Sequence, residues 1–287
     1  IVEMVGTKSH IIYPQGLTKL MFTQASSDDQ FTYNYTNEKV TAGFLRSIDR
    51  YHIIYEKPSF EIYAMKETKN SSLFNREFLE RYTQLPDSLP ERVVELAKEI
   101  TANDDNWYDK VKSIERYFHS SQFTYETEDV AIPGPNDDYV DQFLFETRKG
   151  YCDNFSTSMV VMLRALGIPS RWVKGYSPGE RVGTEGGQNV YEITNNNAHS
   201  WVEVYFPRVG WVPFEPTKGF DNPASFYFDL SNLPSAEDPL PTENETPDET
   251  PVDPTEPQEP NIPKEPEETP NESSGGQKET FSLAKII

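Results

Sequence analysis

The sequence predicts an α+β fold in which helices pack on an antiparallel sheet. Three segments between residues 88 and 166 carry apolar residues at helical spacing. Short runs rich in aromatic and β-branched residues follow the last of these segments, as expected for strands. A helix followed by a series of strands is typical of an α+β domain with an antiparallel sheet.

The composition is that of a folded protein with an excess of acidic residues. The 287 residues suffice for one large domain or two ordinary ones, and 13% of them are aromatic. The formal net charge is −21, with no basic patch, so we expect no nucleic-acid partner. Cys152 is the only cysteine, which excludes an internal disulfide framework and a cysteine-rich zinc site. The chain starts at Ile1 without a signal-peptide pattern and has no apolar run near the ~18 residues of a membrane span, so we expect a soluble piece of a longer protein.

Residues 1–80 are expected to form an accessory, mainly β region. Three aromatic or β-branched runs, separated by Asn, Asp, Lys and Pro, predict strands: 31–35, 51–55 and 60–63. His10 and His52 lie in this region, and we expect both to be structural or surface residues. No pattern in these residues indicates a catalytic or ligand-binding role.

Three helices are predicted, at 88–101, 107–120 and 151–166. The first begins with a capping box formed by Ser88 and Glu91, with a proline in its first turn. The second carries aromatic and aliphatic residues that we expect in the core, and His119 near its end is expected to be a partner of the helix dipole or solvated. The third ends at a glycine, with a proline shortly after that forbids continuation.

Strands are predicted at 122–125 before the third helix and, after it, at 171–176, 190–193, 200–206 and 211–214. The glycine-rich segment 179–188 is expected to be a mobile loop, and 126–139 a second loop. A calcium site is an alternative interpretation of the acidic residues in and after this second loop, Asp137, Asp138 and Asp141. Their spacing is not that of an EF-hand, so a solvated loop is the preferred interpretation.

The acidic excess is concentrated in a proline-rich segment. Between Pro234 and Pro270, 37 positions hold 12 acidic residues, one basic residue and 11 prolines. Such a segment buries little apolar surface, so we expect a disordered, extended linker over 231–280, either a stalk that holds a domain away from an anchor or an inert tail. The apolar residues 281–287 suggest the truncated first turn of a membrane helix.

Cys152, His199 and Glu215 form the candidate catalytic set. Cys152 stands where the third helix begins, and a helix N-terminus favours thiolate over thiol and offers backbone N–H groups to an oxyanion. A nucleophilic cysteine needs a base, and His199 lies at the mouth of the strand at 200–206. Glu215 ends the next strand, 16 residues on, where it would orient the imidazole. Glu203, on the same strand face as His199, is the alternative orienting residue.

Three segments resemble, in order, the nucleophile, histidine and acid segments of the transglutaminase-like superfamily: 150–176, 199–205 and 210–217. The helix at 88–101 and the run at 141–145 fit the same pattern. The resemblance is strong over 82–220 and implies a papain-like α+β core in a catalytic domain at 82–230. Residues 1–80 and the linker resemble, more loosely, the extracytoplasmic part of membrane-anchored bacterial members.

The resemblance implies acyl transfer through a thioester. Cys152 would attack a glutamine-type carboxamide or a peptide carbonyl, His199 would shuttle the proton and Glu215 would orient the imidazole. An amine would then complete a transglutaminase reaction, or water a peptidase or amidase reaction. The family usually has Asp at the position of Glu215, and the added methylene moves the carboxylate by about an ångström. That departure favours, as a further alternative, a non-catalytic peptide or cell-wall binding domain.

The resemblance also implies where and on what the protein would act. It implies protein or peptide substrates, including those of the cell envelope, and no cofactor or metal. It implies a location on the extracytoplasmic face of a bacterial membrane, reached through flanking segments outside this chain. From chain order, the strand at 122–125 is expected to supply the second oxyanion donor.

Overall fold

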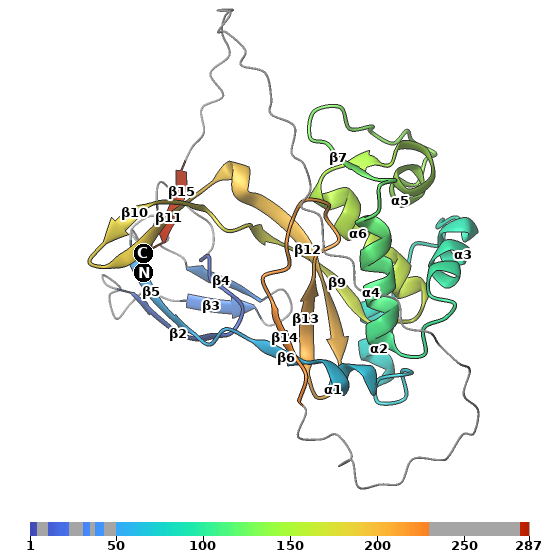
Figure 1. Cartoon of the computed structure of the whole chain (residues 1–287), viewed down its shortest axis with the longest axis horizontal. Helices are drawn as coiled ribbons and strands as arrows, with labels where there is room; N and C mark the ends of the chain where they lie inside the picture. The colour runs from blue at the N-terminus through green and yellow to red at the C-terminus, as the bar shows by residue number, and fades with distance from the viewer. Residues whose placement is uncertain (5–10, 23–30, 35–37, 43–49, 230–281, 287) are drawn as a thin grey trace, which may run out of the picture. The chain divides into compact units, whose positions relative to one another are not determined.

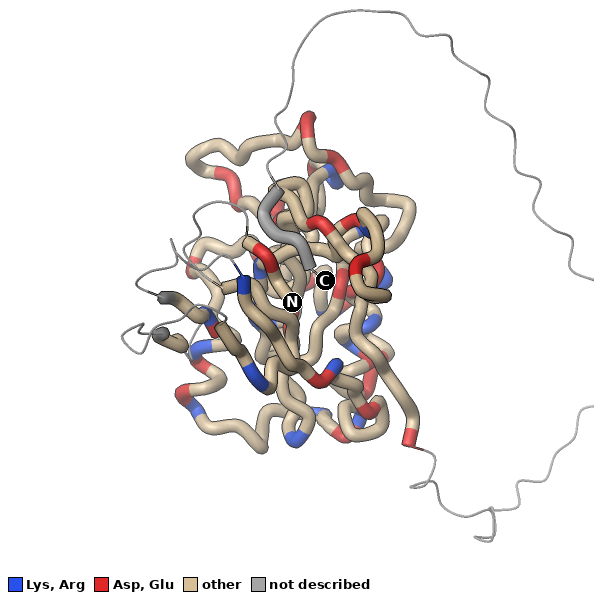
Figure 2. The backbone as a smooth tube through the Cα atoms, turned by 90° about the vertical axis from the view of Figure 1, so that its left-hand side faces the viewer, with Lys and Arg blue, Asp and Glu red and all other residues tan. Residues whose placement is uncertain are grey.

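The structure, a computed structural model, describes residues 1–4, 11–22, 31–34, 38–42, 50–229 and 282–286. The described residues belong to one compact unit. The predicted linker at 231–280 and His10 lie outside the described residues. Acidic and basic positions are interspersed along the described backbone (Figure 2). Among the described helices, none combines the length and the apolar character that crossing a bilayer requires.

Three antiparallel strands form the sheet on which the helices pack, in the order β13-β12-β9: β9 is Ser170–Tyr176, β12 is Ala198–Phe206 and β13 is Gly210–Phe214. Val202 pairs with Phe214, and Val204 with Val212. These four side chains are buried, and helix α6 (Cys152–Ala165) packs on β12 and β9 (Figure 1). The predicted α+β core, with the nucleophile helix on an antiparallel sheet, is confirmed.

The other two predicted helices are α3 (Glu91–Ile100) and α4 (Trp107–Phe118). The capping box predicted at Ser88 and Glu91 is wrong, because Pro90 is the N-cap of α3 and no side chain caps it. Proline disfavours the helical conformation in the residue before it. Leu89 precedes Pro90, so the helix starts only after Leu89. The glycine predicted to end α6 is Gly167, whose φ of 72° lies in the left-handed region.

Aromatic side chains fill the space between α4, α6 and the segment that precedes the cysteine. Phe118, Phe123 and Phe155 are fully buried, and Phe143 nearly so. Their ring centroids lie 5.0 to 6.3 Å apart, a spacing at which aromatic pairs stabilise a core. Phe143 belongs to a π-helix, Gln142–Thr147, that continues the short α5 (Tyr139–Asp141). Because Phe155 lies in the first turn of α6, this cluster fixes the helix end that carries the cysteine.

A second sheet has six strands in the order β10-β11-β15-β1-β5-β2, with bounds β1 Val2–Met4, β2 Leu17–Phe22, β5 Arg50–Tyr55, β10 Glu180–Glu185, β11 Gln188–Thr194 and β15 Ser282–Ile286. The mobile loop predicted at 179–188 is wrong, because β10 occupies most of it and pairs with β11. Gly186 and Gly187 have φ angles of 57° and 83°, as a tight hairpin turn requires. The strand predicted at 190–193 therefore lies in this sheet and not beside β12.

The segment at 282–286 is a strand, and not the helical turn suggested for 281–287. It pairs with β1 on one side, where Ile286 lies opposite Val2, and with β11 on the other, where Ile286 lies opposite Tyr191. The backbone N–H and C=O groups that β1 and β11 expose toward each other are satisfied in this way, which explains the extended conformation.

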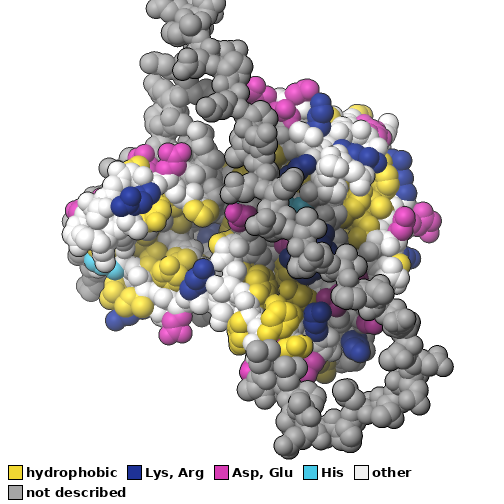
Figure 3. Space-filling view, viewed as in Figure 1, with side chains coloured by type: hydrophobic (Ala, Val, Ile, Leu, Met, Phe, Trp, Pro, Cys, Tyr) yellow, Lys and Arg dark blue, Asp and Glu magenta, His cyan; other side chains and the backbone are white. Residues whose placement is uncertain are grey.

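Six shorter elements lie outside these two sheets: β3 (Phe31–Asn34), β4 (Lys39–Ala42), β6 (Ser59–Glu61), α1 (Ile62–Lys66), α2 (Arg76–Tyr82) and β14 (Ser225–Tyr227). The strand predicted at 60–63 is only half correct, because α1 begins at Ile62. The Glu61 carboxylate accepts hydrogen bonds from the backbone N–H groups of Tyr63 and Ala64, and so caps the helix. Hydrophobic side chains gather where α1 and β14 lie (Figure 3), including the exposed Tyr63 and Phe228.

Candidate active site

The candidate nucleophile, Cys152, is the first residue of α6 and is 7% exposed. The chain turns tightly into this helix: the Asn154 side-chain oxygen accepts the Tyr151 N–H at 3.1 Å. A Cβ at position 150 would lie 2.4 Å from that same oxygen, so only glycine fits before the helix. The backbone N–H of Cys152 has no partner within the helix, and the positive end of the helix dipole lies at its sulfur.

The structure brings His199 and Glu215 together, as the sequence predicts. His199 is the second residue of β12, and Glu215 directly follows β13. Nε2 of the imidazole lies 2.7 Å from Glu215 Oε2. A carboxylate only accepts hydrogen bonds, so Nε2 donates and the ring's Nδ1 is left for the sulfur of Cys152, which also hydrogen-bonds the imidazole. His199 and Glu215 are 8% and 5% exposed, so the three groups meet away from bulk water.

These contacts determine the charge of the imidazole. Burial by itself lowers the pKa of His199, but hydrogen bonds to Cys152 and Glu215 and the negative charges of both raise it to about 9. A protonated imidazole beside the sulfur of Cys152 and the carboxylate of Glu215 is therefore favoured near neutral pH. This is the electrostatic state that a cysteine nucleophile requires.

Glu215 is held at several atoms besides the one that binds the imidazole. Its Oε1 accepts the backbone N–H of Thr217 at 2.8 Å. Its backbone N–H is donated to Glu115 Oε1 at 3.0 Å, and its carbonyl oxygen accepts a hydrogen bond from His119 Nε2 at 2.8 Å. His119 is exposed, in agreement with the expectation of a solvated side chain, but its ring also contacts the site, which the sequence does not predict.

A chain of hydroxyl groups connects the cysteine helix to the histidine strand. Ser200 donates to Asp153 Oδ1 at 2.8 Å and lies 2.9 Å from the hydroxyl of Ser156, which in turn accepts the indole N–H of Trp172 at 2.9 Å. Ser156 and Ser200 are buried. The network ties the residue after Cys152 to the residue after His199, and it thereby fixes the distance between the two reactive side chains.

Aromatic rings cover the imidazole. Phe220 stacks on His199 with a centroid distance of 4.3 Å and an interplanar angle of 14°, and Tyr125 packs on Phe220 at 5.4 Å. Burial, and then the charges of Cys152 and Glu215, raise the pKa of the Tyr125 hydroxyl, which places it near both groups. No pattern in the sequence indicates a role for Phe220, since it follows the last family-like segment as an isolated aromatic residue.

Tyr125 belongs to β7 (Thr124–Tyr125), which runs parallel to β8 (Lys149–Gly150), directly before the cysteine. The strand expected to supply the second oxyanion donor therefore lies beside the nucleophile segment. Its backbone bonds to β8 use the N–H groups of Thr124 and Glu126. That β7 donates to an oxyanion stays a prediction.

Glu203, the alternative orienting residue, is bound elsewhere. Its Oε2 accepts the Arg171 Nε–H at 2.8 Å, and the guanidinium of Arg171 also lies over the Trp211 ring at 4.3 Å. Glu203 lies on the predicted face of its strand, but its carboxylate binds Arg171 of β9 and not His199. Glu203 and Arg171 lie opposite each other in the β12–β9 pairing. Glu215 is thus the carboxylate at the imidazole.

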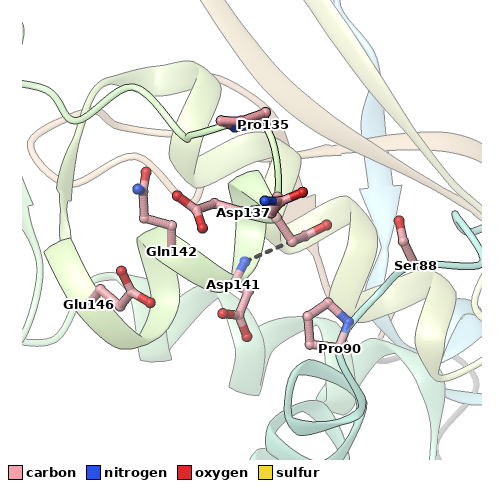
Figure 4. Close-up of a pocket in the computed structure, with 9 residues that line it drawn as sticks. Ser88, Pro90, Pro135, Asp137, Asp141, Gln142 and Glu146 are labelled. Atoms are coloured by element: carbon pink, nitrogen blue, oxygen red, sulfur yellow. Dashed lines mark hydrogen bonds between the residues drawn. The ribbon is translucent and has the colours of Figure 1, made fainter.

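The acidic residues considered for calcium line a separate cavity of about 350 Å³ (Figure 4). Asp138 caps α5 through the N–H groups of Val140 and Asp141, and Asp137 accepts the N–H of Gly134 at 3.0 Å. Asp141 forms a two-point ion pair with Arg92. Within the described ranges, no group of three or more His, Cys, Asp or Glu side chains is placed to hold a metal ion.

Comparison with known proteins places these residues in a family context. The model of the transglutaminase-like superfamily matches residues 94–216, a range that includes Cys152, His199 and Glu215. The chain is 52% identical over 228 residues to the uncharacterized protein YebA of Bacillus subtilis, an alignment that covers 76% of this chain and 30% of YebA. It is 36% identical over 107 residues to a protein-glutamine gamma-glutamyltransferase of Pseudomonas aeruginosa, covering 37% of this chain and 15% of that protein.

The fold is similar to that of the periplasmic domain of TgpA from Pseudomonas aeruginosa, with a TM-score of 0.54 and 22% sequence identity over 75% of this chain and 69% of that one. The chain spans less than a third of the length of the curated relatives above. The family model and the sequence relative of the same type agree on one assignment: residues 94–216 of this chain belong to the transglutaminase-like superfamily.

Proposed function

We propose that the protein is a thiol-dependent acyltransferase of the transglutaminase type that acts on protein or peptide carboxamides. The observation that carries the proposal is the buried set of Cys152, His199 and Glu215, in which the imidazole binds the carboxylate at 2.7 Å and the thiol on its other side. Membership of the transglutaminase-like superfamily supports the same chemistry.

In the first half-reaction, the Cys152 thiolate attacks the carbonyl carbon of a glutamine-type carboxamide and forms a C–S bond. The C–N bond then breaks, and the His199 imidazolium gives its proton to the departing ammonia. The backbone N–H of Cys152, at the N-terminus of α6, would stabilise the oxyanion of the tetrahedral intermediate. Glu215 keeps the ring in the orientation that faces the sulfur.

In the second half-reaction, a primary amine attacks the thioester. His199 accepts the amine proton, the C–S bond breaks, and the product amide leaves as the thiolate is restored. Water in place of the amine yields a carboxylic acid, which would be the amidase or peptidase outcome of the same site.

We further propose that the domain works on the extracytoplasmic face of a bacterial membrane, on protein or peptide substrates of the cell envelope. The support is the similarity of its fold to a periplasmic domain and its strong similarity to part of a much longer Bacillus protein. Labelling of Cys152 in intact cells by a thiol reagent that does not cross membranes is expected under this proposal. Labelling only after lysis would contradict it.

Amine incorporation tests the activity. Purified protein is incubated with a glutamine-containing protein donor and a labelled primary amine, and Cys152→Ala is compared with Thr127→Ala, an exposed substitution. The cysteine variant is expected to lose at least about a thousandfold in rate, because the covalent step disappears, whereas the control keeps its rate. Ammonia or new peptide termini that depend on Cys152, without incorporation, would assign a hydrolase instead. No product in any assay would favour a binding domain.

A further inference from the structure

We propose that helix α4 positions the third member of the catalytic set: Glu115 and His119 hold the backbone of Glu215 and thereby aim its carboxylate at the imidazole. The inference rests on the proposed function and names two positioning residues for it. Neither residue touches Cys152 or His199 by a hydrogen bond found in the described part of the molecule.

The two contacts reach both polar backbone groups of one residue. Glu115 Oε1 accepts the N–H of Glu215 at 3.0 Å, and His119 Nε2 donates to the carbonyl oxygen of Glu215 at 2.8 Å. Glu115 lies in the last turn of α4 and His119 is the C-cap residue of the helix, four residues on, so both lie on the same side of this helix end, one turn from each other. With Thr217 and His199 bound to the two carboxylate oxygens, Glu215 is fixed at four atoms.

The position of Glu115 is unusual for a glutamate. It is 5% exposed and lies in α4 between the fully buried Ile114 and Phe118, where an apolar side chain would be expected. Burying a carboxylate is unfavourable unless it is paired and hydrogen-bonded. An ion pair with Lys112 and the N–H of Glu215 supply those partners. The bond to Glu215 therefore accounts for a charged residue at this core position.

This arrangement addresses a geometric difficulty that the sequence raises. A glutamate has one more rotatable bond than the aspartate usual in the family, so its carboxylate is less restricted relative to the backbone. A catalytic group must be held to within about half an ångström. Fixing the backbone of Glu215 at both polar groups and both carboxylate oxygens removes the freedom that the extra methylene adds.

Alkylation of Cys152 by iodoacetamide tests the inference without any acyl substrate. The rate is measured from pH 5 to 10, and two plateaus are expected: one at low pH, where a thiolate would be paired with the His199 imidazolium, and a higher one after the imidazolium loses its proton near pH 9. Cys152 and Glu215 are the charged groups bound to the ring, and the hydroxyl of Tyr125 responds to both of them.

Glu115→Ala is expected to lower the low-pH plateau about tenfold and to leave the high-pH plateau unchanged, because only the imidazolium depends on an aligned carboxylate. Glu115→Gln keeps an acceptor oxygen and is expected to restore the plateau to within about twofold of the unmodified protein. His119→Ala, at an exposed residue, is expected to act in the same direction with a smaller effect. Glu99→Ala, at an exposed position of α3, is the control.

A double-mutant cycle provides the decisive comparison. In a Glu215→Gln background, Glu115→Ala is expected to change the low-pH plateau by less than about twofold, because a residue that acts through Glu215 has nothing left to position. Unchanged plateaus in Glu115→Ala and His119→Ala would overturn the proposal. A parallel fall of both plateaus would also overturn it, since that result indicates a general loss of structure. If Glu115→Ala does not fold, His119→Ala decides.

The outcome is separable from that of the proposed function. A protein whose alkylation responds to Glu115 but that transfers acyl groups to neither amine nor water would refute the activity and keep the positioning role. A protein that transfers acyl groups, but whose alkylation plateaus do not respond to substitution of Glu115 or His119, would keep the proposed activity and refute the positioning role.

Discussion

The sheet that carries the candidate site buries a carboxylate at each of two places, and the two differ in their partners. Glu215 and Glu203 are both 5% exposed. Glu203 binds the guanidinium of Arg171, a group that keeps its charge at every accessible pH, and Arg171 is itself stacked on Trp211. Glu215 binds an imidazole whose charge depends on pH and on the thiol beside it. The identity of the cation, and not the burial of the carboxylate, separates a structural ion pair from a reactive one.

The most direct test of this difference between the two carboxylates is to neutralise each of them and to measure acyl transfer. Glu215→Gln is expected to lower kcat by a factor of about a hundred to ten thousand, because an amide cannot stabilise the imidazolium. Glu203→Gln is expected to keep kcat within a few fold when the protein is folded. Equal losses of kcat in the two variants would contradict a catalytic role specific to Glu215.

For stability, in contrast to kcat, the larger effect is expected in Glu203→Gln. Glu203→Gln leaves Arg171, in a largely buried setting, with the more exposed Glu38 as its remaining charged partner, and is expected to reduce the free energy of unfolding by about 2 kcal/mol. Glu215→Gln keeps a hydrogen-bonding side chain beside an imidazole that can become neutral, so the loss is expected to be smaller. Urea unfolding of both variants at pH 7 measures the difference. A larger loss of unfolding free energy in Glu215→Gln than in Glu203→Gln would contradict the interpretation of Glu203 as the structural ion pair and of Glu215 as the reactive one.

The pH dependence of stability separates the two pairs further. The pKa of His199 is raised from 6.5 to about 9 in the folded protein, so its contribution is fully present below pH 6.5 and is lost as the pH rises through 9. The unfolding free energy is therefore expected to fall between pH 6.5 and 9, by at most about 3 kcal/mol. In Glu215→Gln this slope is expected to flatten, whereas Glu203→Gln should keep it. An unchanged slope in Glu215→Gln would refute the assignment.

The smallest effect is expected at the hydroxyl network beneath the site. Ser200→Ala removes the bridge from β12 to Asp153 and Ser156, and is expected to lower stability by about 1 kcal/mol and kcat several-fold. Thr184→Ala, on β10 in the other sheet, is a comparable loss of a hydroxyl away from the site. A kcat for Ser200→Ala equal to that of the control would mean that the network does not set the distance from Cys152 to His199.

The residues of the candidate set were predictable because local sequence marks each of them. Cys152 begins a helix, His199 begins a strand, and Glu215 ends the strand that pairs with it, so adjacency follows from one hairpin and one helix packed on it. The choice between Glu215 and Glu203 was harder. It depended on Arg171, opposite Glu203 on β9, and a strand pairing across 32 residues is not visible in local periodicity.

Features that depend on distant parts of the chain escaped prediction. Glu115 and Glu215 are 100 residues apart, and the helical pattern of α4 gives no sign of what its polar residues bind. The strands β10 and β15 were assigned to a loop and to a helical turn. Their partners, β11 for one and β1 with β11 for the other, determine their conformation, because strand formation depends on pairing more than on intrinsic preference.

The pairing of β1 with β15 has a mechanical consequence. The strands are antiparallel and Val2 lies opposite Ile286, so the two ends of the chain leave the sheet side by side (Figure 1). Tension applied between these ends would load the ladder one hydrogen-bonded pair at a time, as in a zipper, and not all pairs together as in shear. The pairing of β1 with β15, in the middle of the sheet, would therefore open first and at a low force, while β15 still pairs with β11, which leads through a short turn to the strand of His199.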